Sequence, residues 1–294
     1  MKKIFVLSII FSFSSLLIFA QNIDDIISKH IDAHGGMENW KSIESMKITG
    51  KFTSFSETKD FMTIIAKPNM YYSEFGLGIH NVEEGMNGDN SWTLNPWLDI
   101  FTYRRATASE HNVFQQKAEF CTPLFHYKEP GYKFEFKGKE NIEGTEVLNI
   151  EVTKPNGNIE SWFLDTKTYL EHMSKSTWAD FTSPSEQEVF YSEFTKVGKV
   201  TIPFYVERVF GIRLRVTEIE NVEFNVDVDK NIFNLPMSNE MKKLKVLEGD
   251  WNVKIDVLGR GGWSTADSTT SRIKYLENFN ILQENMSYVR YFPV

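Results

Sequence analysis

Apolar and polar residues alternate through the middle of this 294-residue chain. Tyr132, Phe134 and Phe136 are separated by Lys133 and Glu135, which is the period-two pattern of a strand with one buried face. Later segments repeat the pattern, and turns rich in Asn, Gly and Pro separate them. The pattern predicts strands at residues 132–137, 147–153, 162–164 and 169–174. They form an antiparallel meander whose apolar face must curl around something.

Short strands on both sides extend this sheet. Asn87-Gly88 stands between two of them and is a favoured hairpin turn. Before the meander, strands are predicted at residues 46–56, 61–67, 71–75, 80–86 and 91–94, and after it at 187–194, 202–210 and 213–224. Because no helical segment interrupts the first five, the sheet is predicted to be antiparallel and not a parallel α/β sheet.

Two regions carry the helical period instead. Residues 22–34 place isoleucines at helical spacing, and Gly35-Gly36 ends that helix. Residues 108–128 repeat apolar residues at a spacing near 3.6, and Thr122-Pro123 is predicted to begin a second short helix there. We expect the two short helices of 108–128 to lie against the concave side of the sheet as a lid or plug.

Residues 1–20 have the pattern of a secretory signal peptide. Lys2-Lys3 precede an apolar run from Ile4 to Phe19, and Ala20 precedes polar residues. An uncleaved anchor is the alternative, although the serines in the run make it a poor membrane span. No cysteine follows the expected cleavage point, so the mature chain is not predicted to be a lipoprotein itself. We expect export to the periplasm.

Composition and charge narrow the possible partners. The chain holds 24 Phe, 11 Tyr and 7 Trp, an excess that fits a β-rich interior of ligand size. Its formal net charge is −8, and removal of the signal with its two lysines makes the balance more acidic. This balance argues against nucleic acid and anionic membrane surfaces as partners. Cys121, the single cysteine, is interpreted as a packing residue.

Candidate chemistry is sparse. The sequence has no Gly-x-Ser-x-Gly, His-Glu-x-x-His, Cys-x-x-Cys or phosphate-loop motif, so neither an enzyme nor a cofactor is predicted. His30 and His34 lie four residues apart on the first predicted helix and could clamp a metal. Two ligands without a nearby third favour a solvated helix face instead.

An ordered set of short motifs resembles the LolA/LolB-like family of periplasmic lipoprotein carriers over residues 22–237. In that family the fold is a strongly curved antiparallel sheet, an unclosed half-barrel with helices on its concave face, and the apolar cavity receives lipoprotein acyl chains. The arginine that controls opening in those carriers has no identified counterpart here. The motifs are His34-Gly35-Gly36 with Trp40, Ile48–Phe52, Ala66–Asn69, Gly88 with Trp92, Gly131–Gly144, Phe163–Asp165 with Thr168–Leu170, Ile202–Phe204 and Phe233–Pro236.

Residues 240–294 resemble the opening of an uncharacterised lipocalin-like (calycin) barrel, in which a short helix leads into a Gly-x-Trp strand. Gly249-Asp250-Trp251 carries that likeness. About 55 residues supply three or four strands, fewer than the roughly eight that close a small barrel. The segment is therefore expected to be a partial β unit, either cut short or paired with the first domain or with another chain. The predicted domains are 21–237 and 240–294.

The resemblance and the alternation together predict a mostly β (α+β) protein that carries or senses hydrophobic ligands such as lipoprotein acyl chains. The alternative is a structural or interaction domain of the cell envelope with a filled core, whose C-terminal segment docks a protein partner. The candidate cavity residues are Phe52, Ile64, Tyr72, Trp92, Phe134, Phe136, Ile150 and Trp162 from the sheet, and Phe114, Phe120, Leu124 and Phe125 from the lid.

Overall fold

The computed structural model describes residues 23–180, 183–276 and 281–287. A helix at residues 23–33, here called the opening helix, confirms the helical pattern of the first segment, and α2 (Met37–Lys41) follows it. The predicted signal peptide lies outside the described residues. Within the described ranges, no helix is both long and apolar enough to cross a membrane.

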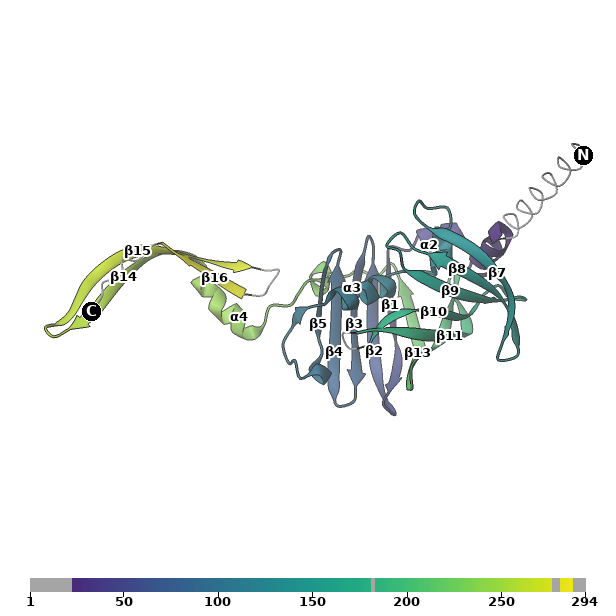
Figure 1. Cartoon of the computed structure of the whole chain (residues 1–294), viewed down its shortest axis with the longest axis horizontal. Helices are drawn as coiled ribbons and strands as arrows, with labels where there is room; N and C mark the ends of the chain where they lie inside the picture. Colours follow the sequence, from purple (N-terminus) through teal and green to yellow (C-terminus); the bar gives the residue numbers. More distant parts are fainter. Residues whose placement is uncertain (1–22, 181–182, 277–280, 288–294) are drawn as a thin grey trace, which may run out of the picture.

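Thirteen strands form one antiparallel sheet in the order β6-β5-β4-β3-β2-β1-β13-β12-β11-β10-β9-β8-β7. The first meander is β1 (Ser45–Ser54), β2 (Glu57–Ala66), β3 (Met70–Leu77), β4 (His80–Asn87), β5 (Asn90–Leu94) and β6 (Arg104–Arg105). The second is β7 (Lys133–Ile142), β8 (Thr145–Thr153), β9 (Ile159–Asp165), β10 (Glu171–Asp180), β11 (Ser183–Val197), β12 (Val200–Phe210) and β13 (Arg213–Phe224). Because β6 and β7 are edges and do not pair, the curved sheet is an open half-barrel, which confirms the predicted fold class (Figure 1).

The two meanders join where β1 pairs with β13. The register shifts between Thr49 and Gly50, which is a β-bulge in the pairing. A Cβ at Gly50 would collide with the carbonyl oxygen of Glu218 on β13, so glycine is required for this close approach. The bulge joins strands far apart in sequence into one continuous wall.

The convex face of the first meander is covered by the segment that follows β13. In this segment η3 (Lys230–Phe233) carries Phe233, which is fully buried against Ile64 and Met70. The indole N–H of Trp92 donates to the carbonyl oxygen of Phe233 at 3.0 Å. Both faces of β2 are therefore apolar, and alternation alone does not show which of them is concave.

Helices cover part of the concave face. The opening helix buries Ile26, Ile27 and Ile31 in the main core together with Trp40. Two further short helices occur in residues 108–128, as predicted: α3 (Ala108–Lys117) and η2 (Pro123–His126), which begins at the predicted proline. Figure 1 shows α3 lying across the strands around β3.

The C-terminal segment forms a separate three-stranded sheet in the order β14-β15-β16. Its elements are α4 (Asn239–Leu244), η4 (Lys245–Leu247), β14 (Gly249–Gly259), β15 (Gly262–Leu276) and β16 (Ile281–Met286). A short helix thus precedes the Gly-x-Trp strand, as the resemblance implied. The sheet extends away from the half-barrel (Figure 1) and exposes large apolar side chains such as Trp251 and Trp263.

Candidate ligand-binding cavity

Two adjoining cavities lie on the concave side beside the end of α3. The first, here called the apolar chamber, has a volume of about 320 Å³ and is lined by inward-facing residues of β1, β2, β3, β12 and β13. The second, the polar chamber, has a volume of about 260 Å³ and is lined mainly from β9–β12 and the segment after α3. Lys117, Glu119 and Arg208 line both, so the chambers meet at these residues.

Aromatic rings and small polar residues shape the apolar chamber. Phe61 and Phe75 are cross-strand partners, and the ring of Phe52 meets that of Phe75 edge-on at 5.0 Å between centroids. The hydroxyls of Thr63 and Ser73 bond to each other at 2.9 Å, which satisfies both on the inner wall. Because these two side chains are short, they leave room that larger residues would fill.

The polar chamber is lined by hydroxyl and amide groups. The hydroxyls of Ser174 and Tyr191 lie 2.9 Å apart, and the amide N–H of Gln187 donates to the Ser176 hydroxyl at 2.8 Å. The amide oxygen of Gln187 has no hydrogen-bond partner among the described residues, although Gln187 is only 5% exposed. This chamber therefore presents an acceptor that a ligand donor could satisfy.

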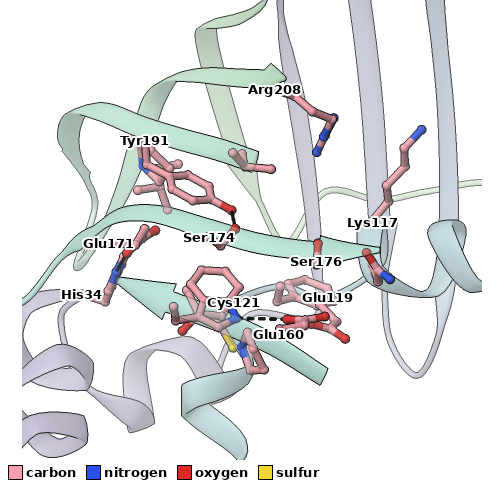
Figure 2. A pocket seen from close by; sticks show the side chains of 18 of the residues that line it. His34, Lys117, Glu119, Cys121, Glu160, Glu171, Ser174, Ser176, Tyr191 and Arg208 are labelled. Carbon is pink, nitrogen blue, oxygen red and sulfur yellow. Dashed lines mark hydrogen bonds and ion pairs between the residues drawn. The ribbon is translucent and has the colours of Figure 1, made fainter. Parts of the chain in front are cut away.

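Three basic side chains, here called the cation cluster, line the apolar chamber, and the first two also line the polar chamber: Lys117, Arg208 and Arg215. Arg208 and Arg215 are directly opposite each other on β12 and β13. Lys117 Nζ lies 2.6 Å from Glu84 Oε2. Figure 2 shows Arg208 and Lys117 at the end of the polar chamber that is remote from His34 and Glu171.

Burial weakens the charged form of each member of the cation cluster. Burial first, and then the neighbouring charge of Arg208, lower the pKa of Arg215 to about 10. The pKa of Lys117 is also lowered, first by burial and then by the two arginines, although Glu84 opposes this. Burial likewise lowers the pKa of Arg208. The guanidinium groups of the two arginines stay cationic, and burial makes the charged form of all three side chains less favourable.

A buried ion-pair network lies on the other side of the polar chamber. Lys154 Nζ is 2.9 Å from Glu119 and 2.7 Å from Glu160, and its side chain is 6% exposed. Burial disfavours the ammonium, yet the two carboxylates raise the pKa of Lys154 overall. Burial raises the pKa of the neighbouring Cys121 thiol to about 12, so it stays protonated at neutral pH, consistent with the packing role predicted for it.

His30 and His34 are buried, so the predicted solvated helix face is wrong for them. They point into the half-barrel, where Glu171 on β10 supplies a third ligand-type residue; the three potential donor atoms lie within 4.8 Å of one another. The opening helix turns this face inward because its isoleucines and histidines pack against the same sheet. The sequence could not show Glu171 nearby, since it follows His34 by 137 residues.

Each ring nitrogen of the two histidines has a protein partner. His30 Nδ1 donates to the Tyr169 carbonyl at 2.8 Å, and its Nε2 lies 2.7 Å from the Thr122 hydroxyl. His34 Nδ1 donates to the Thr201 carbonyl at 2.7 Å, and its Nε2 is 2.6 Å from Glu171. Hydrogen bonds to the protein therefore hold both imidazole rings in place.

The pKa values separate the two rings. Burial lowers the pKa of His30 to about 4, so this ring is neutral. Burial also acts against His34, but Glu171 overcomes it and raises the pKa of His34. The pKa of Glu171 is lowered by His34 despite complete burial. Both shifts favour the charged forms of His34 and Glu171, which lie 2.6 Å apart.

The structure places the predicted cavity residues in three groups. Phe52 lines the apolar chamber, and Trp162 and Phe120 line the polar chamber, where a ligand contact stays a prediction. Several of the others belong to the main core or pack against it, on the concave side beside the helices: Phe114, Leu124, Phe125, Phe134, Phe136 and Ile150.

Ile64, Tyr72 and Trp92 lie on the convex face, so they do not line the concave chambers. Ile64 and Tyr72 pack around Phe233, and the Trp92 indole bonds to the Phe233 carbonyl. The reason is the covering segment after β13, which requires an apolar convex face on β2 and β3. Strand alternation does not reveal that this segment, which is distant in sequence, folds back across the sheet.

The cation cluster was missed from the sequence, although one signal for it exists. On β12 the inward stripe reads Ile202, Phe204, Val206, Arg208 and Phe210 at every second position. A charged residue in phase with four apolar ones marks a buried charge. Lys117 carried no such signal, since a lysine in the last turn of a helix is ordinarily exposed and favourable there.

Comparison with known proteins gives distant structural likeness. No family model matches the chain, and no curated protein does either. A DUF1329 family protein from Desulfovibrio piger is 12% identical, with TM-score 0.47, and the match covers 72% of this chain and 96% of that one. A LolA superfamily protein from Nitrosomonas europaea is 10% identical, with TM-score 0.47 and coverage of 71% and 96%.

An outer membrane lipoprotein-sorting protein domain from Vibrio parahaemolyticus is 10% identical, with TM-score 0.46 and coverage of 71% and 95%. These matches include the superfamily that the sequence motifs resemble. Likeness at this level is too distant to indicate a ligand or an activity. The fold and the cavity themselves define a curved antiparallel half-barrel with a two-part hollow on its concave side.

Proposed function

We propose that this chain is an exported, non-enzymatic carrier or sensor that binds the apolar part of a lipid-like ligand on its concave face. The observation that carries the proposal is the apolar chamber of about 320 Å³, which is the size of a small ligand site. Acyl chains of lipoproteins in the periplasm are the ligands that the sequence resemblance implies.

The energetics of such binding depend on how much of the chain must be ordered. Each buried methylene contributes about 0.8 kcal/mol, while ordering a lid costs roughly 1–2 kcal/mol per residue. In this protein α3 is already anchored: Thr107 and Glu110 form a capping box, and Arg104 binds the Glu110 carboxylate through two hydrogen bonds of 2.8 and 2.9 Å. Because the lid is preformed, the free energy gained by burying the ligand's methylenes is not offset by the cost of ordering the lid.

A second candidate is an interaction domain of the envelope that binds no lipid. The observation in its favour is the C-terminal sheet, where Trp251 is 44% and Trp263 72% exposed. Exposed aromatic residues of this kind are common at protein interfaces. This candidate requires that the apolar chamber take up no ligand.

A chamber-filling variant separates the two. Thr217 lines the apolar chamber on β13, whereas its neighbour Glu218 is exposed on the opposite face, so Thr217→Trp and Glu218→Trp form a matched pair. We expect the parent and Glu218→Trp to bind the neutral probe N-phenyl-1-naphthylamine and to retain lipid detectable by native mass spectrometry. Thr217→Trp should lose both. Equal binding by the two variants, or none by the parent, would contradict the carrier proposal.

A further inference from the structure

His30, His34 and Glu171 form a buried group of residue types that bind transition metals. His30 lies on the opening helix, His34 follows it by one helical turn, and Glu171 begins β10, so the group joins the helix to the sheet. One potential donor atom from each residue lies within 4.8 Å of the other two, and none of the three residues is more than 3% exposed. Two imidazoles and a carboxylate are a known set of protein ligands for zinc.

Backbone carbonyl groups orient both imidazole rings. A carbonyl oxygen can only accept, so Nδ1 of His30 carries the hydrogen in its 2.8 Å bond to Tyr169. Nδ1 of His34 likewise carries the hydrogen in its 2.7 Å bond to Thr201. In a neutral ring the other nitrogen, Nε2, then has a lone pair to offer. Because metal-ligating histidines almost always donate their second nitrogen to a carbonyl, a carboxylate or water, both rings have the tautomer and the support that zinc ligands have.

The Nε2 atoms meet oxygen atoms that can themselves bind a cation. Nε2 of His34 is 2.6 Å from Glu171 Oε2, and Nε2 of His30 is 2.7 Å from the Thr122 hydroxyl oxygen. Since Nδ1 of His34 is already protonated, its Nε2 meets the carboxylate through a second proton, and a zinc ion could replace that proton. Zinc–ligand bonds of about 2.0–2.2 Å hold neighbouring ligands roughly 3–3.5 Å apart, so side-chain shifts on the order of 1 Å would close the group around the ion.

The group borders the polar chamber, which gives an ion a way in. His34, Thr122 and Glu171 line that chamber, and Figure 2 shows His34 and Glu171 facing each other at one end of it. Elsewhere the rings of Trp40 and Phe125 pack against His34, with centroids 6.3 and 6.0 Å away. The chamber leaves room for a fourth ligand, and at zinc sites with three protein ligands that place is taken by water or substrate.

We propose that His30, His34 and Glu171 bind one Zn²⁺ ion, with a water molecule from the polar chamber as the fourth ligand. The ion enters as the proton between His34 and Glu171 leaves to solvent, and it fastens the end of the opening helix to β10. This site goes beyond the proposed carrier function and does not depend on it, since the apolar chamber is lined by other residues.

Metal titration of the untagged protein, stripped with EDTA and then freed of the chelator, tests the proposal. We expect isothermal titration calorimetry to show one Zn²⁺ per chain, and Co²⁺ in its place to give the intense visible absorption of a four-coordinate site. His34→Gln and Glu171→Gln, whose amides can still hydrogen-bond, should each weaken zinc binding about tenfold or more, since even the loss of an outer partner of a ligand costs that much.

Controls separate loss of the site from loss of the fold. His111→Gln is the matched variant, because His111 is a half-buried histidine that bonds to the Ser91 hydroxyl at 2.8 Å and lies outside the group. It should bind zinc as the parent does. Thermal melting in EDTA checks that each variant folds. Zinc X-ray absorption of the parent needs no variant, and it should show two imidazole rings and only nitrogen and oxygen ligands at about 2.0–2.2 Å.

Every outcome bears on the zinc site alone. One ion per chain, two imidazole ligands and weaker binding by both site variants would support it. If the parent takes up no zinc, if the cobalt spectrum has only the weak bands of a six-coordinate ion, or if Glu171→Gln binds zinc as tightly as His111→Gln does, the proposal is wrong. Uptake of the neutral probe N-phenyl-1-naphthylamine, measured in EDTA, tests the carrier proposal separately.

Discussion

The concave face of the half-barrel has a filled end and a hollow part, and buried charge is arranged differently in the two. At the filled end, beneath the opening helix, the interior is packed with isoleucines and aromatic rings, and His34 pairs with Glu171 at 2.6 Å where this packing borders the polar chamber. In the hollow part the cation cluster stands beside one paired carboxylate, Glu84. The two regions therefore differ in filling: side chains close the first, and the second keeps a hollow lined by charged and polar groups.

Local sequence explains why one end is filled. Gly35 lets the end of the opening helix approach the backbone of Lys199 and Val200 so closely that a Cβ there would collide with the Lys199 carbonyl oxygen. In the hollow part, Thr63, Ser73 and Thr217 face inward, and they are too short to meet side chains from the opposite side. Residue size along the inner wall therefore decides where space remains.

The largest expected effect is a loss of stability when a side chain of the filled end is shortened. Ile27 is 1% exposed in the main core, whereas Ile48 lines the apolar chamber and is half-buried. Ile27→Ala should lower the free energy of unfolding by about 2–5 kcal/mol, since it leaves a cavity in close packing. Ile48→Ala should cost about half as much, because its side chain already borders open space. Urea unfolding of both variants measures the difference, and equal losses would mean that the two regions are packed alike.

The sequence alone predicted some features of these regions and not others. Alternation and turn chemistry predicted the strands, the two helical regions and the helix start at Pro123, because these depend on neighbours along the chain. The convex covering of Ile64, Tyr72 and Trp92 depends on a segment more than 130 residues later, which local patterns do not reveal.

The candidate site was harder to predict for the same reason. Phe52 was identified as a cavity residue because alternation gives parity within a strand. The meeting of Arg208 with Lys117 requires the curvature of the sheet and the position of α3, which no periodicity encodes. Only the phase of Arg208 on an apolar stripe could have indicated a buried charge there.

A second expected effect is a dependence of stability on pH, which comes from His30, the neutral histidine of the filled end. The pKa of His30 falls from 6.5 to about 4 on folding, because burial disfavours the imidazolium. Between these values the unfolded chain binds more protons than the folded one, so stability is present above pH 6.5 and is lost as the pH falls toward 4. The loss attributable to His30 is roughly 3 kcal/mol near pH 4.

His30→Gln should remove this part of the acid sensitivity. Denaturant unfolding at pH 7 and pH 4 would give the two free energies for the parent and the variant. His34 has the opposite sign, since its pKa is raised and its contribution is lost as the pH rises through the folded value. If the parent and His30→Gln lose the same stability between pH 7 and 4, His30 is not held neutral by burial.

The smallest expected effect concerns α3, which packs into the main core through Val113 and Phe114 and ends at Lys117 beside both chambers. Glu110 closes the capping box with Thr107 and binds Arg104 of β6, so Glu110→Gln weakens the charge-assisted bonds at the start of the helix. We expect a loss of about 1 kcal/mol, as is typical for a helix cap. If the lid is preformed, as carrier function requires, amide hydrogen exchange should rise in α3 and leave the opening helix unchanged. Exchange that rises equally in both helices would show that the lid and the filled end open as one unit, which would make the hollow part inaccessible without global unfolding.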